Sequence, residues 1–170
     1  MEELRIAKDR IAILIGKKGE IKEKISKLTK TKIKIDSKEG DIIITGNSLD
    51  TYNTKQIIHA IGRGFNPDRA LMLLEEEKIF EIINIEDYSR KTKKDLKRLK
   101  SRIIGRKGRA RQIIENLANV DLSIYGKTVS IIGKIEDVGI ARHAINNLLA
   151  GSKHGSVYSY LEKQRKLKKE

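Results

Sequence analysis

The stretch Ile103-Ile-Gly-Arg-Lys-Gly-Arg109 decides the fold, because an earlier part of the chain repeats it. Leu14-Ile-Gly-Lys-Lys-Gly19 carries the same glycine spacing 89 residues before it. Further pairs keep this phase over about fifty residues, with a two-residue gap in one turn. These pairs are Ile33 with Leu122, Ile35 with Ile124, and Gly46 with Gly133. A repeat of this length indicates that one structural unit has been duplicated.

The spacing of apolar residues predicts the same element order in both copies: strand, helix, helix, strand, strand, helix. In the first copy we expect a strand at 4–6, helices at 10–15 and 20–29, strands at 31–36 and 41–45, and a helix at 48–62. In the second copy we expect a strand at 79–85, helices at 93–104 and 109–119, strands at 120–125 and 128–132, and a helix at 135–150. The predicted fold class is α+β, with two tandem units, each a three-stranded antiparallel sheet with three helices packed on one face.

The only proline, in Asn66-Pro67-Asp68, marks the boundary between the two units. Because proline suits the first position of a helix, a short helix is expected to start there. The resulting organisation is a first unit at 1–65, a linker helix at 66–77, a second unit at 78–151, and a basic C-terminal tail or helix at 152–170.

The charge of the chain favours a polyanionic partner. The formal net charge is +14, of which +4 falls in residues 1–75 and +10 in residues 76–170. Lysine and arginine gain affinity for nucleic acid by releasing the counterions condensed on phosphates. A charge-rich surface of the kind found in heat-adapted proteins is the alternative, but it does not explain a one-sided charge. The absence of cysteine and of a long apolar run predicts a cytoplasmic protein without a membrane partner.

A glycine-bounded loop between two helices is well suited to hold a phosphodiester strand. The glycines let the backbone turn without a Cβ in the way, and the next helix offers amide groups to a phosphate. In this element order, the motif resembles the KH domain of type I, whose loop clamps the backbone of four nucleotides. The resemblance implies an apolar groove beside each loop, lined by Ile15, Ile33 and Ile35 in the first copy, and by Ile104, Leu122 and Ile124 in the second.

These considerations define a set of candidate RNA-binding residues. In the first copy they are Gly16, Lys17, Lys18, Gly19, Ile33 and Ile35. In the second they are Arg102, Ile104, Gly105, Arg106, Lys107, Gly108, Arg109, Arg111, Leu122 and Ile124. Acidic residues follow the first loop and dilute its field, so the second is expected to contribute more. Either loop could instead be only a tight connection between helices.

Two basic features near the second loop leave alternatives open. The run 90–102 holds eight basic residues, and it is either a solvated helix face or a contact for the RNA backbone; the second is favoured because Leu96, Leu99 and Ile103 form an apolar stripe. Arg109-Ala110-Arg111 departs from the more usual apolar start of the second helix of a KH domain. This departure either shifts the phase of the helix or widens the phosphate contact.

The whole chain resembles the archaeal members of the Pno/Dim family, which assist maturation of the small ribosomal subunit. The residues that carry the resemblance are the two loops and Leu-Ala-Gly-Ser-Lys-His-Gly-Ser-Val-Tyr at 149–158. The resemblance implies binding near the 3′ end of small-subunit ribosomal RNA. It also implies partnership with the Nob endonuclease and, in archaea, with the alpha subunit of translation initiation factor two.

The predicted function is therefore noncatalytic binding of single-stranded RNA during small-subunit assembly and 3′-end processing. The alternative is a general tandem KH module of a transcription or RNA-decay complex. An enzyme such as a small nuclease has little support, because no nucleophile and base pair is evident. No catalytic residue, cofactor or metal ligand is predicted, since His59, His143 and His154 lie far apart in the sequence.

Overall fold

The computed structural model describes residues 1–169, which form two compact units, Met1–Glu76 and a second from Glu77 onward. Each unit contains one three-stranded antiparallel sheet, with strand order β1-β3-β2 in the first unit and β4-β6-β5 in the second. In both sheets the last strand of the unit lies in the middle, paired on its two sides with the first and second strands. The predicted fold class, two tandem KH units of α+β type, is confirmed.

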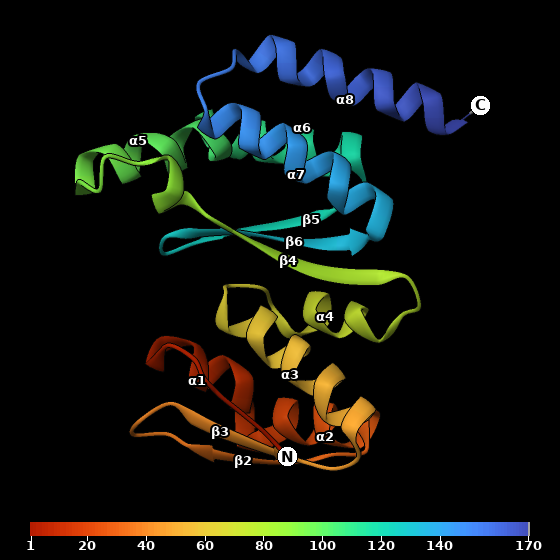
Figure 1. Ribbon diagram of the computed structural model, residues 1–170. Coiled ribbons are helices and arrows are strands. Elements are labelled where there is room, and N and C mark those ends of the chain that lie inside the picture. The colour runs from red at the N-terminus through yellow and green to blue at the C-terminus, as the bar shows by residue number, and fades with distance from the viewer. Residues whose placement is uncertain (170) are drawn as a thin grey trace. The chain divides into compact units, whose positions relative to one another are not determined.

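The first unit follows the predicted order of elements (Figure 1). Its strands are β1 (Glu2–Arg5), β2 (Lys32–Asp36) and β3 (Asp41–Thr45), and its main helices are α1 (Lys8–Ile15), α2 (Glu20–Thr29) and α3 (Ser48–Gly62). The three helices lie on one side of the sheet. A short helix α4 (Pro67–Ala70) and a 3-10 turn η2 (Leu71–Leu74) pack on α3 at the end of the unit.

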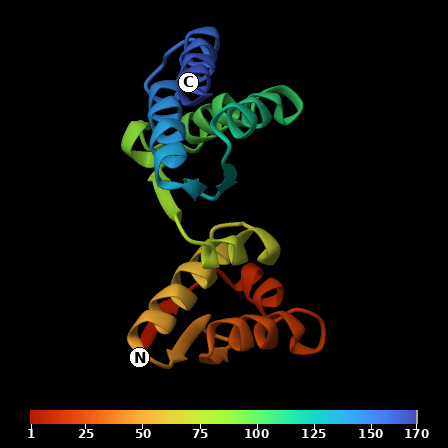
Figure 2. The same cartoon turned by 90° about the vertical axis from the view of Figure 1, so that its right-hand side faces the viewer.

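The second unit repeats this order and adds one helix. Its strands are β4 (Lys78–Asn84), β5 (Asp121–Tyr125) and β6 (Thr128–Lys134), and its helices are α5 (Lys93–Ile104), α6 (Arg109–Ala118), α7 (Ile135–Leu149) and α8 (His154–Lys169). A 3-10 turn η3 (Ile85–Tyr88) links β4 to the loop before α5. Helix α8 packs on α6 and α7, on the side away from the sheet. Figure 2 shows this layering from the side.

Aliphatic side chains from the sheet and the helices form the core of each unit. In the second unit, Leu99 and Ile103 of α5, Ile114 of α6 and Ile131 of β6 are fully buried. Val157 and Leu161 extend this core to α8. Burying a large aliphatic side chain is worth about 1.5–3 kcal/mol, so these contacts hold the helical layer on the sheet. The apolar stripe predicted in the basic run is thereby confirmed.

Most element boundaries agree with those predicted to within two residues, in helices and strands alike. Helix α1 begins at Lys8, two residues before the predicted start at 10, and β6 ends at Lys134, two residues after the predicted end at 132. Helix α3 is capped by Asn47, whose side chain accepts a hydrogen bond of 2.8 Å from the amide of Asp50, and Ser48 is the first helical residue. The described part of the C-terminal tail, predicted as a tail or helix at 152–170, is helical from His154. No helix among residues 1–169 has the length and apolar content needed to cross a membrane.

Candidate nucleic-acid interface

The two Gly-x-x-Gly loops have the same backbone conformation. In the second unit, Gly105 has φ 74° and ψ 178°, Lys107 has φ 55° and ψ 28°, and Gly108 has φ 75° and ψ 13°. Each angle at the counterpart positions of the first loop lies within one degree of these values. A lysine at positive φ is uncommon, because the left-handed region costs about 1–2 kcal/mol for residues with a Cβ. Both loops therefore hold the same strained turn, with a basic side chain at its centre.

The first glycine of each loop is required by packing. A Cβ added to Gly105 would lie 2.6 Å from Cβ of Ala110 and 2.7 Å from its amide nitrogen. A Cβ added to Gly16 would lie 2.3 Å from Cγ1 of Ile21. Around Gly108 and Gly19, in contrast, nothing lies within 4 Å of an added Cβ, so these two positions need glycine only for their backbone angles.

Several amides of the loop are already used within it. The amide of Gly105 donates to the carbonyl of Ser101 at 2.8 Å, and that of Gly108 donates to the carbonyl of Gly105 at 3.2 Å. The amide of Arg109 donates to the carbonyl of Arg106. The expectation that the helix start offers bare amides therefore does not hold for these three groups. Any attraction for a phosphate then depends more on the cationic side chains of the loop.

Helix α6 keeps the phase of its counterpart α2, although its first turn differs. Ala110 occupies the position of Ile21, and both Ile25 and Ile114 are fully buried four residues later. Ala110 is itself buried, with 3% of its surface exposed. The departure Arg109-Ala110-Arg111 thus replaces a large apolar side chain with a small one and places exposed arginines on both sides of it.

The predicted cationic residues fall into two groups. Lys17, Lys18, Arg106, Lys107 and Arg109 are exposed on or directly after the loops. Two other predicted residues have partners within the protein, Arg102 in a part-buried position and Arg111 at the surface. Arg102 donates from Nε to the carbonyl of Leu148 at 2.9 Å, and from Nη2 to the carbonyl of Ser152. Arg111 pairs with Glu115 at 3.2 Å, one turn later on α6.

Arg102 has a structural role that the sequence did not suggest. It satisfies carbonyl groups at the end of α7 and in the turn that leads to α8. In the first unit, Arg10 does the same for the carbonyls of Ile61 and Phe65, at 2.7 and 2.8 Å. The two arginines come from different positions of their helices, which is why alignment of the repeats does not pair them. The last carbonyl groups of a helix have no partner within the helix, and an arginine side chain can donate hydrogen bonds to them.

The predicted apolar groove is only partly accessible. Ile33 and Leu122 are each 4% exposed and belong to the cores of their units. Ile15, Ile35, Ile104 and Ile124 are half-buried, so each unit keeps two aliphatic side chains at the surface beside its loop. Because Ile33 and Leu122 are buried, they support the groove from the core. Their contact with RNA stays a prediction.

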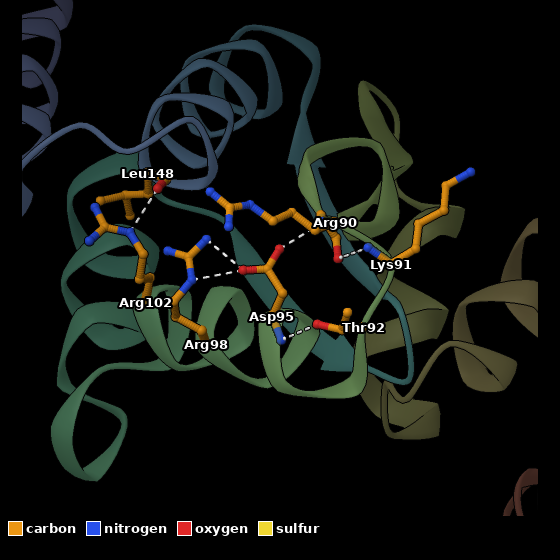
Figure 3. Close-up of polar contacts among 8 residues, drawn as sticks. Arg90, Lys91, Thr92, Asp95, Arg98, Arg102 and Leu148 are labelled. Carbon is orange, nitrogen blue, oxygen red and sulfur yellow. Dashed lines mark hydrogen bonds and ion pairs between the residues drawn. The ribbon is translucent and has the colours of Figure 1, made fainter.

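A polar cluster holds the start of the basic helix α5 (Figure 3). The side chain of Thr92 accepts a hydrogen bond of 3.0 Å from the amide of Asp95. The Asp95 carboxylate accepts from the amide of Arg90 at 2.8 Å and from Nε of Arg98 at 2.9 Å. These bonds lower the pKa of Asp95, chiefly through the Arg90 amide and then through Arg98. The cluster fixes the first turn of α5 and pairs Arg98, which stays exposed, with the Asp95 carboxylate.

The Asp95 cluster predicts a specific pH dependence. A carboxyl group with a lowered pKa stabilises the folded state fully at pH values above its ordinary pKa of 3.8, and this stabilisation is lost as the pH falls through the lowered value. Carboxyl titration by NMR should therefore give Asp95 a pKa below 3.8. Arg98→Gln should move that pKa only part of the way back, because the Arg90 amide is the larger cause. Complete restoration in Arg98→Gln would contradict this order of causes.

A cavity of about 720 Å³ lies beside the second loop and includes residues that the sequence did not suggest. Its lining includes Arg98, Ile113, His154 and Tyr158. The Nε2 atom of His154 lies 2.8 Å from the carbonyl of Arg102, so Nε2 carries the proton and donates. His154 and Tyr158 belong to the motif at 149–158, which is the sequence signal that points to this wall.

The surroundings of the other two histidines, His59 and His143, indicate structural roles. His59 is half-buried on α3, and this burial, more than its cationic neighbours, lowers its pKa. His143 stacks at a tilt on Tyr160, with ring centroids 4.7 Å apart. Within residues 1–169, no group of three or more histidine, cysteine, aspartate or glutamate side chains could hold a metal ion.

Comparison with known families matches both units. Residues 79–166 match a eukaryotic type KH domain (KH domain type I), and residues 1–60 match the KH domain. The KH domain-containing protein MJ0443 of Methanocaldococcus jannaschii is 42% identical over 170 residues, covering 97% of this chain and 74% of the relative. The pre-rRNA-processing protein pno1 of Aspergillus fumigatus is 32% identical over 111 residues, which is 64% of this chain and 44% of the relative.

Two solved structures from Pyrococcus horikoshii OT3 share the fold and much of the sequence. Dim2p is 51% identical, with a TM-score of 0.89, covering 95% of this chain and 98% of that one. A chain in a complex of a/eIF2alpha, aDim2p and rRNA is 50% identical, with a TM-score of 0.91, covering 97% of this chain and 93% of that one.

Proposed function

The chain belongs to the Pno/Dim family of KH-domain proteins, and we propose that it binds single-stranded RNA as a noncatalytic factor in small ribosomal subunit assembly and ribosomal RNA 3′-end processing. Under this proposal the KH domains span 1–65 and 78–151, with residues 66–77 as a linker and 152–170 as a C-terminal extension. Because ribosomes of the archaeal relatives assemble in the cytoplasm, the protein would work there.

The second loop carries this proposal. Arg106, Lys107 and Arg109 are exposed there, and the first turn of α6 holds no acidic residue. The first turn of α2 holds Glu20 and Glu23, which weaken the field of the first loop. A phosphodiester strand would cross the second loop while its bases pack on Ile104 and Ile124. The low aromatic content, 4%, agrees with aliphatic packing instead of stacking as the main contact in this groove.

The partners follow from the relatives. The name of the complex from Pyrococcus horikoshii OT3 joins aDim2p to a/eIF2alpha and to ribosomal RNA. With 50% identity to a chain of that complex, this protein would bind ribosomal RNA and the alpha subunit of translation initiation factor two. The family resemblance implies that the bound segment is the 3′ region of small-subunit ribosomal RNA. The family resemblance adds the Nob endonuclease as the enzyme that cuts the bound RNA.

Crosslinking in cells, followed by sequencing of the bound RNA, tests this function. We expect crosslinks concentrated at the 3′ end of small-subunit ribosomal RNA, because that is the segment the assembly factor would hold. Crosslinks spread across messenger RNAs would favour a general tandem KH module instead. Recovery of the bound RNA intact after incubation with magnesium is expected from a noncatalytic factor, and cleavage that persists through stringent purification would contradict this part of the proposal.

A further inference from the structure

The cavity beside the second loop is a separate compartment from the predicted groove. The groove side chains Ile104, Leu122 and Ile124 come from the end of α5 and from β5, and none of them lines the cavity. The cavity lies between α5, the start of α6 and the start of α8, and shares only the loop and its arginines with the groove. Its volume, about 720 Å³, falls in the range of sites that hold a small organic ligand.

Two features of the second unit create this space. The first is Ala110, which stands where the first unit has Ile21, a side chain that packs directly against the first glycine of its loop. The second is α8, which provides the outer wall; after α3, the first unit instead has the short helix α4. A small side chain and an added helix together open a cavity at a position that an isoleucine fills in the other copy.

The outer wall is firmly held. At the start of α8, His154 donates to the carbonyl of Arg102, and Arg102 donates to the carbonyl of Ser152 just before the helix. At the other end, Lys168 forms an ion pair with Asp137, which is buried at the start of α7. Since both ends of α8 are anchored, the ring of Tyr158 has a defined position over the cavity.

The lining matches the chemistry of a nucleotide. It contains four arginines and no acidic side chain. Arg98 is paired with Asp95 and Arg102 donates to backbone carbonyls, so Arg106 and Arg109 are the cations that can meet an anion here. Ile113 and the ring of Tyr158 offer apolar surface for a base, with the His154 ring 6.0 Å from that of Tyr158 in an edge-on arrangement. Burial raises the pKa of Tyr158, partly opposed by Arg109, so its hydroxyl stays protonated and can donate a hydrogen bond.

We propose that this cavity binds one further nucleotide of the RNA, next to those held by the second loop, with its base against Tyr158 and Ile113 and its phosphate on Arg106 and Arg109. The inference rests on the proposed function and extends it. An RNA nucleotide is favoured over an acidic peptide because the cavity adjoins the loop, and Gly105 and Arg106 border both compartments. An RNA strand that crosses the loop would therefore place its next nucleotide in the cavity, against α8.

A length series of RNA tests this site. The RNA recovered by crosslinking is trimmed to the four nucleotides expected in the groove and extended one nucleotide at a time at each end. For the natural chain, affinity should rise about tenfold when one particular nucleotide is added, as for a base stacked on an aromatic ring. In Ala110→Ile, the larger side chain narrows the cavity at the start of α6, so this increment should be lost while the shortest RNA that binds keeps its affinity.

A pair of variants at Tyr158 tests the same site without changing the packing at Ala110. Tyr158→Ala should lose the same increment, and Tyr158→Phe should keep most of it, because the ring provides the stacking. If Ala110→Ile does not fold, this pair gives the answer. An increment that survives both Ala110→Ile and Tyr158→Ala would overturn the inference and leave the proposed function standing. If RNA of no length binds the natural chain, the proposed function itself fails. Competition by an acidic peptide for the cavity, without any effect of RNA length, would also overturn the inference.

Discussion

Replacing Arg106 and Lys107 together with aspartate is expected to reduce the affinity for single-stranded RNA on the order of 100-fold at low salt, because phosphate contacts supply most of the affinity. Both side chains are exposed on the second loop, so the change reverses the charge there without entering the core. Aspartate also tolerates the left-handed angle of Lys107, at φ 55°. The fold should therefore persist while binding is lost.

The salt dependence of binding separates this effect from a general loss of structure. On a single strand, each lost phosphate contact should lower the slope of log affinity against log salt by about 0.7, so the double variant should lose about 1.4. Fluorescence anisotropy with a labelled fragment of the ribosomal 3′ end measures both quantities. A full loss of affinity with an unchanged slope would contradict direct phosphate contact by this loop.

The first loop provides the matched control. Lys17 and Lys18 occupy the same positions on an identical backbone, but Glu20 and Glu23 follow them. Their replacement with aspartate should therefore weaken binding much less than the change in the second loop. Equal losses in the two double variants would show that the units share the RNA evenly, and a larger loss in the first would reverse the proposed roles.

The backbone of this protein could be predicted from its sequence because the repeat supplied each element twice. The helices Glu20–Thr29 and Lys93–Ile104 were predicted with their observed ends, since glycine loops bound each of them on one side. Periodicity also identified Leu99 and Ile103 as core residues. These features depend on neighbours along the chain, and local spacing records them well.

The functional surface was less predictable because it depends on contacts across long sequence distances. Arg102 belongs to a basic run, but its guanidinium is held by Leu148 and Ser152, some fifty residues away. The alternation in the second strand of each unit places both apolar residues on the same face, but it does not tell how deeply each is buried, and Ile33 is more deeply buried than Ile35. The cavity walled by α8 depends on tertiary packing that has no counterpart in the first copy. The spacing of residues in the sequence therefore located the second loop, but it did not reveal the cavity beside that loop.

Gly105→Ala is expected to destabilise the second unit by roughly 3 kcal/mol or more. The conformation at φ 74° and ψ 178° is open almost only to glycine, and holding a residue with a Cβ in it costs about 1–3 kcal/mol. The new Cβ would also lie 2.7 Å from the backbone nitrogen of Ala110, which cannot move without shifting α6. Strain and overpacking therefore add.

Gly108→Ala is the matched control, three residues away in the same loop. Nothing lies within 4 Å of its added Cβ, and its angles, φ 75° and ψ 13°, belong to the left-handed region that alanine enters at a cost of about 1–2 kcal/mol. Hydrogen exchange followed by mass spectrometry resolves the two units, so the loss of protection should be confined to peptides from Glu77 onward. The variant Gly105→Ala should therefore be much less stable than Gly108→Ala. Equal losses would mean that backbone angles alone demand glycine in this loop, and that the contact with Ala110 relaxes at little cost.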